Sequence, residues 1–254
     1  MKSLSSVMDL LFPPKCVFCR KIKGGVSFCE KCAENLPYTK NGGRETGEFF
    51  DFCISPLYYK GVVRDSILRY KFGGAANYAD TYAKILADCI REHLGDIQGD
   101  GQPRETAASE PDGVEAESVM PEQSVPGDTG TVKRGKMYDI ISWVPLSGKR
   151  KRSRGYDQAM LLALATALEL SDVAAETLKK TKDVQAQSEI KGRDARRANI
   201  SGAYEAADPE LVAGKRVLLI DDVYTTGTTL SECARILLMA GAESVVCAAL
   251  ARGE

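Results

Sequence analysis

Short apolar runs alternate along the chain with longer stretches in which apolar residues recur at helical spacing. The apolar runs predict strands at residues 52–59, 138–144, 217–220 and 244–250. The helical spacing predicts helices at residues 62–72, 78–92, 159–170 and 231–240. Strands that alternate with helices form βαβ units, whose crossovers build a parallel sheet. We therefore expect an α/β fold with a mostly parallel sheet flanked by helices.

The strand at 217–220 runs into a polar turn, and residues 217–229 together are VLLIDDVYTTGTT. Four aliphatic residues suit a strand that is buried on both faces of a parallel sheet. The turn leads to the helix at 231–240, an order of elements that presents backbone N–H groups to a phosphate. We expect the phosphate to be bound by Val223, Tyr224, Thr225, Thr226, Gly227, Thr228 and Thr229.

Two adjacent carboxylates, Asp221 and Asp222, lie between this strand and the turn. They would repel a bare phosphate, so the ligand must offer something else that carboxylates bind. A diol or a shared Mg²⁺ meets this requirement, and a sugar phosphate with free 2′ and 3′ hydroxyls fits both halves of the segment. An ordinary buried strand with a polar turn is the plainer alternative, but packing gives no reason for paired acids and four threonines around one glycine.

The segment resembles the phosphoribosyl diphosphate (PRPP) motif of type I phosphoribosyltransferases, which has four apolar residues, two acids, a short spacer and a Thr–Gly turn. The resemblance implies the fold of those enzymes and a site for PRPP with Mg²⁺. It also implies that Asp221 and Asp222 are the catalytic pair, which holds the ribose hydroxyls directly or through Mg²⁺.

A basic segment follows the predicted strand at 138–144, with five basic residues among 149–154. Its place beside the Asp221 strand favours a diphosphate ligand over the alternatives, a solvated basic loop or a nucleic-acid patch. The expected diphosphate loop comprises Pro145, Lys149, Arg150, Lys151, Arg152, Arg154 and Gly155. A second basic segment, at 179–197, is predicted to be a lid over the substrate. Its closing residues are expected to be Lys182, Lys191 and Arg193.

Two C-x-x-C pairs near the start of the chain predict a structural zinc site. The ligands are expected to be Cys16, Cys19, Cys29 and Cys32. Each pair can place two thiolates on one tetrahedral ion, and nearby lysines and arginines favour the thiolate form. A redox pair is the alternative, but no thioredoxin-like pattern surrounds either motif. With four protein ligands the ion has no open position, so we expect no catalysis at the metal.

Charge is distributed unevenly along the 254 residues. Residues 95–132 hold nine acids and one base, a net charge of −8, which leaves +7 on the rest of a chain whose formal charge is −1. This stretch has no aromatic residue, so it cannot bury enough apolar area to offset its ordering entropy. We expect a disordered acidic insertion at about 95–135, with a partner-binding segment as the alternative.

Composition favours a globular protein of the cytoplasm. No apolar run approaches the ~20 residues that span a bilayer, and we identify no secretory signal. Cys53, Cys89, Cys233 and Cys247 are scattered, as buried thiols usually are. We divide the chain into a zinc-binding module at 1–45, similar to a double zinc ribbon, and a phosphoribosyltransferase domain at 46–254.

Taken together, the motifs resemble those of the ComF (competence protein F) family, a branch of the type I phosphoribosyltransferases. The shared features are the cysteine pairs, YKFxG at 70–74, VPL at 144–146, RGYDQ at 154–158, Gln187-Ser188, and the diphosphate motif. Asp157 departs from the family pattern, which more often has Asn there. The resemblance implies PRPP, Mg²⁺ and, in some members, a role in DNA uptake or in sugar-acid metabolism.

The function that we predict is transfer of a 5-phosphoribosyl group from PRPP to a nitrogenous acceptor. Two alternatives are kept. One is an accessory protein of DNA uptake that binds nucleic acid, single-stranded DNA included, or the uptake machinery. The other is a regulator that senses PRPP without turnover. A homodimer is a further open hypothesis, and the sequence does not name the acceptor.

Overall fold

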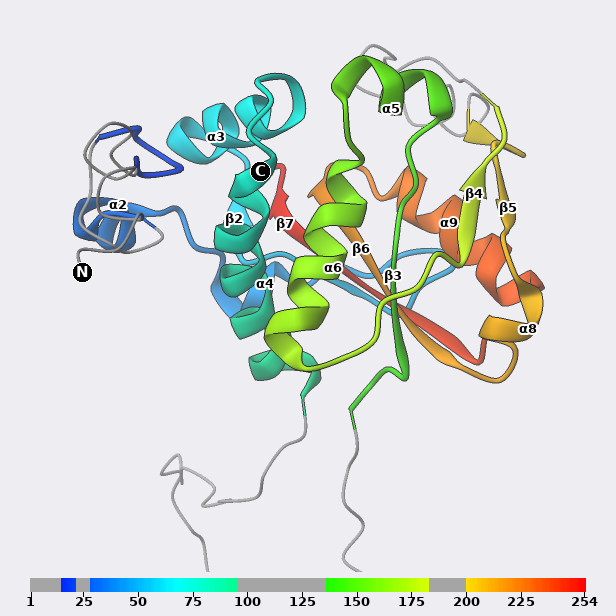
Figure 1. Ribbon diagram of the computed structural model, residues 1–254. Coiled ribbons are helices and arrows are strands. Elements are labelled where there is room, and N and C mark those ends of the chain that lie inside the picture. Colours follow the sequence, from blue (N-terminus) through cyan, green and yellow to red (C-terminus); the bar gives the residue numbers. More distant parts are fainter. Residues whose placement is uncertain (1–14, 22–27, 96–135, 183–199) are drawn as a thin grey trace, which may run out of the picture.

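The computed structural model describes residues 15–21, 28–95, 136–182 and 200–254 (Figure 1). Its main sheet has the strand order β1-β7-β6-β3, with β2 also paired to β7, and every pairing in it is parallel. The strands are β1 (Cys53–Ile54), β2 (Leu57–Tyr58), β3 (Ile140–Trp143), β6 (Arg216–Tyr224) and β7 (Ser244–Arg252). The predicted α/β fold with a mostly parallel sheet is confirmed.

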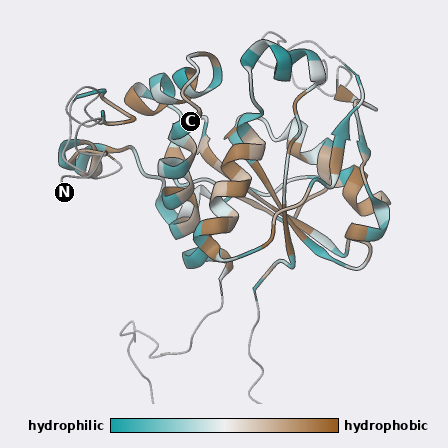
Figure 2. Cartoon of the chain, viewed as in Figure 1, coloured by the Kyte–Doolittle hydropathy of each residue, from teal (hydrophilic) through white to brown (hydrophobic). Residues whose placement is uncertain are grey.

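Helices cover both faces of this sheet. One layer contains α3 (Gly61–Phe72), α4 (Ala79–Leu94) and α6 (Gln158–Leu170), and the opposite face carries α9 (Thr228–Met239). Successive side chains of β6 alternate between these layers. Leu218 and Ile220 belong to the core under α4 and α6, whereas Val217 and Leu219 belong to the core under α9. Burial on both faces explains the uninterrupted aliphatic run, and Figure 2 shows hydrophobic strands between helices with hydrophilic outer surfaces.

Shorter elements complete the described residues. The remaining helical segments are α2 (Glu30–Asn35), η1 (Lys40–Gly43), η2 (Ala76–Tyr78), α5 (Gly148–Arg154) and α8 (Pro209–Val212). A separate antiparallel ribbon pairs β4 (Leu178–Lys180) with β5 (Tyr204–Ala206). β4 overlaps the first two residues of the segment at 179–197 that was expected to form a lid.

Three predicted elements differ from the structure. The single strand expected at 52–59 is instead two short strands, because Pro56 between them lacks an N–H donor. β6 does not end before the carboxylates but continues to Tyr224, which pairs with Arg252 of β7. α9 begins at Thr228, three residues earlier than its apolar spacing indicated.

The N-terminal segment packs directly on α3. The Arg69 guanidinium Nη2 donates hydrogen bonds to the carbonyls of Val17 at 2.9 Å and Phe18 at 2.7 Å. The Ser66 hydroxyl donates to the same Val17 carbonyl at 2.6 Å. Phe18 is buried in the core beneath α3 and α4. The cysteine knuckle that contains Val17 and Phe18 is therefore joined to the helix by buried polar and apolar contacts.

Several other predictions concern organisation. The four scattered cysteines are buried free thiols, as expected. From residue 96 onward the predicted acidic insertion lies outside the described residues, and the domain boundary at 45/46 stays a prediction. Among the described residues, no helix combines the length and apolar character needed to cross a bilayer.

Candidate functional site

A cleft of about 270 Å³ opens where β3 and β6 end. This is the edge of a parallel sheet at which ligands bind in α/β folds. Its lining residues are Tyr59, Lys71, Val144, Pro145, Leu146, Arg150, Arg154, Gln158, Ala159, Lys180, Tyr204, Asp221, Asp222, Val223, Thr225 and Thr229. The cleft thus brings together the predicted carboxylates, part of the threonine turn and part of the basic segment.

The two carboxylates sit on consecutive residues of β6 and therefore point toward different faces of the sheet. Asp222 faces the α3 side, where its Oδ1 lies 2.7 Å from the Lys71 Nζ. Asp221 accepts a hydrogen bond from the Asp222 backbone N–H at 2.8 Å. Burial, together with the neighbouring charge of Asp222, raises the pKa of Asp221 to about 7. Extension of β6 through these residues gives the pair a rigid support.

Lys71 was not among the residues predicted to form the site. It occupies the last turn of α3, and its side chain is 19% exposed. Burial by itself would lower the pKa of Lys71, but the ion pair with Asp222 and the nearby charge of Asp221 raise it. The only signal in the sequence was the YKFxG segment at 70–74, which carried the family resemblance without a role.

The threonine turn forms a small recess beside the cleft. This recess, of about 30 Å³, is lined by Asp221 and residues 223–230. Gly227 has a φ of 70°, and a Cβ there would lie 3.0 Å from the Tyr224 hydroxyl, so glycine is needed at this position. Gly227 is also the N-cap of the 12-residue helix α9, and no side chain caps that end. The first N–H groups of α9 therefore point into a recess that suits a phosphate.

The basic segment forms a helix, so its interpretation as a loop was wrong in secondary structure. α5 begins after Ser147, whose hydroxyl accepts from the Arg150 N–H at 3.5 Å, and ends at Gly155 with a φ of 83°. Arg150 and Arg154 are four residues apart on one helical face and both line the cleft. The residues of the expected loop that do not line it are Lys149, Lys151, Arg152 and Gly155. Pro145 lines it as expected.

Arg154 and Asp157, at the end of the basic segment, make different contacts. The Arg154 guanidinium lies 4.7 Å from the Phe72 ring centroid and donates to the Gln158 side-chain oxygen at 2.9 Å. Burial lowers the pKa of Arg154 from its ordinary value. Asp157 is buried, caps α6 by accepting from the Met160 N–H at 3.2 Å, and accepts from the Leu146 N–H at 2.9 Å. Its carboxylate orders the cleft wall through these contacts.

The ribbon of β4 and β5 contributes a wall that the sequence did not indicate. Lys180 donates a hydrogen bond from Nζ to the Tyr204 hydroxyl at 2.9 Å, and both residues line the cleft. Lys182 is exposed and does not line the cleft. Lys191 and Arg193 lie outside the described residues, so the lid stays a prediction.

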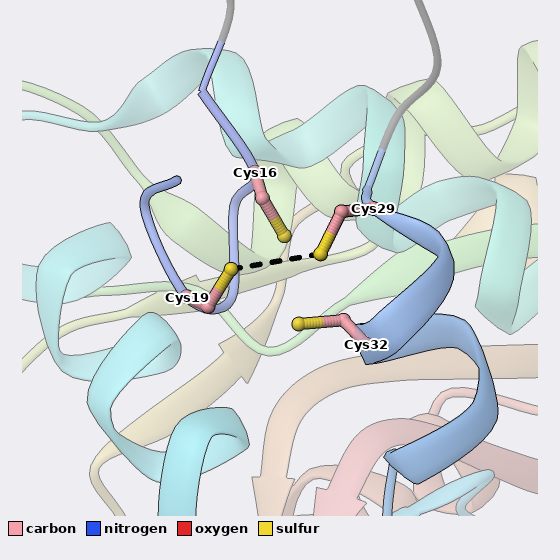
Figure 3. Close-up of side chains that lie close together, drawn as sticks. All are labelled: Cys16, Cys19, Cys29 and Cys32. Carbon is pink, nitrogen blue, oxygen red and sulfur yellow. Dashed lines mark hydrogen bonds between the residues drawn. The ribbon is translucent and has the colours of Figure 1, made fainter. Parts of the chain in front are cut away.

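The four N-terminal cysteines converge on one point (Figure 3). Their sulfur atoms all lie within 4.8 Å of one another, and the Cys19 and Cys29 sulfurs are 3.6 Å apart. Tetrahedral zinc with ~2.3 Å bonds to sulfur requires sulfur–sulfur distances of about 3.8 Å. Burial of Cys16 is outweighed by hydrogen bonds from the backbone of Cys19, Cys29 and Phe18, which lower its pKa to about 6. The cluster therefore has the ligands and the spacing that zinc requires.

Comparison with known proteins finds two family domains in the chain. Residues 155–254 match the phosphoribosyl transferase domain, and residues 7–50 match the double zinc ribbon domain. Competence protein F of Haemophilus influenzae is 35% identical over 120 residues, 46% of this chain and 52% of that protein. Competence protein ComFC of Streptococcus pneumoniae is 31% identical over 121 residues, 48% of this chain and 51% of that protein. Over about half of its length the chain is thus similar to competence proteins of the ComF family, and it combines a phosphoribosyl transferase match with a zinc ribbon match.

Other ComF relatives carry a different name. The DNA utilization protein YhgH of Escherichia coli O157:H7 is 34% identical over 108 residues, 42% of this chain and 46% of that protein. The chain thus spans about half the length of the curated relatives it matches. A solved glutamine PRPP amidotransferase from B. subtilis aligns with 43% of this chain and 22% of its own, at 24% identity and a TM-score of 0.31.

The zinc ribbon match and the cysteine cluster both support a structural zinc ion in this chain. The phosphoribosyl transferase match includes Asp221, Asp222 and the threonine turn. That match supports a phosphoribosyltransferase-type fold. Neither match tests which of the residues in the cleft bind a ligand.

Proposed function

We propose that the chain binds PRPP with Mg²⁺ and transfers its phosphoribosyl group to a nitrogenous acceptor. The observation that carries the proposal is that one cleft unites a carboxylate pair, a phosphate-type helix N-terminus and two arginines. A single ligand with a diol and two phosphate groups at opposite ends has partners for all three. The phosphoribosyl transferase match over residues 155–254 supports the same assignment.

Each part of the cleft suits one part of PRPP. The turn at 225–229 binds the 5′-phosphate through its hydroxyls and the N–H groups of α9. Asp221 and Asp222 accept hydrogen bonds from the ribose hydroxyls. Arg150 and Arg154 bind the diphosphate, since guanidinium groups pair well with phosphate oxygens. The lid residues proposed from the sequence would close over this end of the ligand.

The residues present fit Mg²⁺. Two carboxylates and several hydroxyls that line the cleft supply the oxygen ligands that this ion prefers, usually alongside waters and substrate phosphates. Asp221 and Asp222 would hold it, directly or through the ribose hydroxyls. When bound, Mg²⁺ supplies charge neutralisation to the diphosphate.

The reaction replaces a C1–O bond of ribose with a C1–N bond. The electron pair of the breaking bond leaves with the diphosphate, the acceptor nitrogen donates its lone pair to C1, and the nitrogen loses a proton. Positive charge develops on the sugar and negative charge on the leaving group. Asp221 and Asp222 stabilise the first, and Arg150 and Arg154 stabilise the second. The protein needs positioning and charge, with no covalent nucleophile.

Calorimetry with PRPP and Mg²⁺, followed by incubation with a pool of nitrogenous bases and mass spectrometry, tests this function. Asp221→Asn with Asp222→Asn should keep the fold and lower PRPP affinity about a hundredfold, because two charged contacts are lost. Inorganic phosphate should bind the double variant at least as well as the parent, because repulsion falls. Asp139→Asn, at the opposite end of the strand pair, is the matched control.

Two results distinguish the remaining possibilities. New nucleotides from the base pool support the transferase, whereas Mg²⁺-dependent PRPP binding without product from any acceptor supports a sensor. Unchanged PRPP binding in the double variant would show that the carboxylates are structural and would remove the proposal.

A second candidate is an accessory role in DNA uptake. Three bases of α5, Lys149, Lys151 and Arg152, are exposed and do not line the cleft, so they are available to a polyanion outside it. The names of the competence and DNA utilization relatives favour the same role. Salt-dependent binding of single-stranded DNA that weakens in a Lys149→Gln, Lys151→Gln, Arg152→Gln variant would support it, and unchanged binding would not.

A further inference from the structure

Lys71 forms an ion pair with Asp222, one of the two carboxylates that the proposed substrate needs. Its Nζ lies 2.7 Å from Asp222 Oδ1, and the two side chains are 19% and 12% exposed. An ion pair this well shielded from water blocks one oxygen of Asp222 against a competing cation or a diol. The same pair neutralises a charge that would otherwise stand beside Asp221. The ligand-free cleft is thus stabilised by a cation supplied by the chain itself.

Hydrogen bonds fix the backbone around Lys71, whereas its side chain is held at the ammonium group by the Asp222 carboxylate. The Tyr70 hydroxyl donates to the Gln158 carbonyl at 2.8 Å, and Gln158 Nε2 donates to the Lys71 carbonyl at 3.3 Å. The Tyr156 hydroxyl also donates to the Tyr70 carbonyl. These bonds attach the last turn of α3 to the start of α6. The lysine stem is flexible, so its ammonium can change partners while its anchor stays in place.

The same cleft would also bind an anion that replaces Asp222 as the partner of Lys71. Arg150 and Arg154 line it together with Lys71. The charge of Arg150 disfavours the charged form of Arg154, while that of Asp222 favours it. An anion placed between these three cations is attracted by the positive charge of each. Diphosphate supplies such an anion, whereas a ligand with only a sugar and one phosphate does not.

We propose that Lys71 is a resident counter-ion of Asp222 that divalent metal displaces, and that the freed ammonium then binds the diphosphate group of the incoming ligand. The inference rests on the proposed function and adds to it a positioning residue that exchanges partners. Metal and diphosphate binding are thereby coupled through one side chain. The protein would then hold diphosphate weakly until the metal has released Lys71 from Asp222.

The test measures two probes, Mn²⁺ alone as a stand-in for Mg²⁺, and inorganic diphosphate both without metal and with Mn²⁺. Lys71→Met should bind Mn²⁺ alone about tenfold more tightly, because the competing cation is gone, and should bind diphosphate in the presence of Mn²⁺ about tenfold more weakly. Lys71→Arg should recover most of the diphosphate affinity. Asp222→Asn should bind metal-free diphosphate more tightly, because Lys71 is released. That gain should vanish in the double variant Lys71→Met with Asp222→Asn.

Lys136→Met is the matched control, since Lys136 forms an ion pair with Asp172 at 2.6 Å and does not line the cleft. It should change neither probe's affinity. If Lys71→Met leaves both affinities unchanged or weakens both, Lys71 is a structural ion-pair partner and the inference fails. If the parent binds neither probe nor PRPP with Mg²⁺, the proposed function fails as well, which separates the two results.

Discussion

The cysteine cluster and the cleft are both sets of converging polar side chains, but they are assembled in opposite ways. Four identical ligands from two short segments approach within 4.8 Å in the cluster, and none of them carries a compensating charge. The cleft combines carboxylates and cations from several elements, and Lys71 already pairs with Asp222. Like ligands need an ion to hold them together, whereas opposed charges satisfy one another until a ligand rearranges them. The first site is therefore coupled to folding and the second to binding.

The two regions meet at α3. Arg69 donates to the Val17 and Phe18 carbonyls, which lie inside the first cysteine knuckle. Lys71, two residues later on the same helix, reaches the cleft. A change in the zinc module can thus reach the cleft through one turn of helix.

The largest expected effect is loss of zinc from the cysteine cluster, which distinguishes the cluster from the cleft. Cys16→Ser should reduce zinc from one ion per chain to none and unfold the N-terminal module, because apparent zinc affinities of ~10–16 kcal/mol are also folding energy. Metal analysis and limited proteolysis measure both. Cys89→Ala, which removes a buried thiol outside the cluster, should keep the zinc. Zinc retained by Cys16→Ser would contradict the four-ligand assignment.

The next effect tests the connection through α3. Arg69→Met should cost about 2–4 kcal/mol of stability, since two buried carbonyls lose a charged donor, and should also weaken diphosphate binding several-fold. Urea unfolding and calorimetry measure the two changes. As a control, Arg91→Met removes a side chain that donates to the Glu169 carbonyl and does not line the cleft, and it should leave diphosphate affinity unchanged. Equal losses of affinity in both variants would show a general destabilisation.

A smaller effect on stability is expected at the start of β6, the end of the strand away from Asp221 and Asp222. Asp139 accepts hydrogen bonds from Arg216, which lower its pKa to about 2. Its unfolded value is about 3.9, so the stabilisation is present above pH ~4 and is lost as pH falls from ~4 to ~2. Both side chains are about one-third exposed, and solvent screening limits the effect to about 1 kcal/mol. Urea midpoints at pH 5 and pH 2.5 should therefore differ less in Asp139→Asn than in the parent.

The smallest effect is expected from removing the acidic segment. The Met137 N–H donates to the Leu94 carbonyl at 3.2 Å, so the two ends of this segment lie side by side. Replacing residues 97–132 with a short linker should change the free energy of unfolding by only ~1 kcal/mol and leave PRPP affinity nearly unchanged. A loss of cooperative unfolding in thermal melts would show that the segment is part of the core.

Local patterns of residue type in the sequence predicted much of this architecture. The aliphatic run at 217–220 and the Thr–Gly turn located β6 and the turn before α9, because burial on both faces and a positive φ leave direct traces in residue type. The five bases at 149–154 indicated a polyanion site but gave the wrong element. Ser147 and Gly155 are residue types that cap helices, so they were the local signals for a helix there.

The sequence by itself determined the parallel α/β fold, the cysteine cluster and the Thr–Gly turn after β6, since the strands, helices, cysteine pairs and turn each depend on residues close to one another in the chain. Only the tertiary structure decided which charges meet in the cleft. Lys71 reaches Asp222 across 151 positions, and only two of the five bases in α5 face inward. Such pairings depend on how α3 and α5 pack over the end of the sheet, and packing directions leave no trace in local residue spacing.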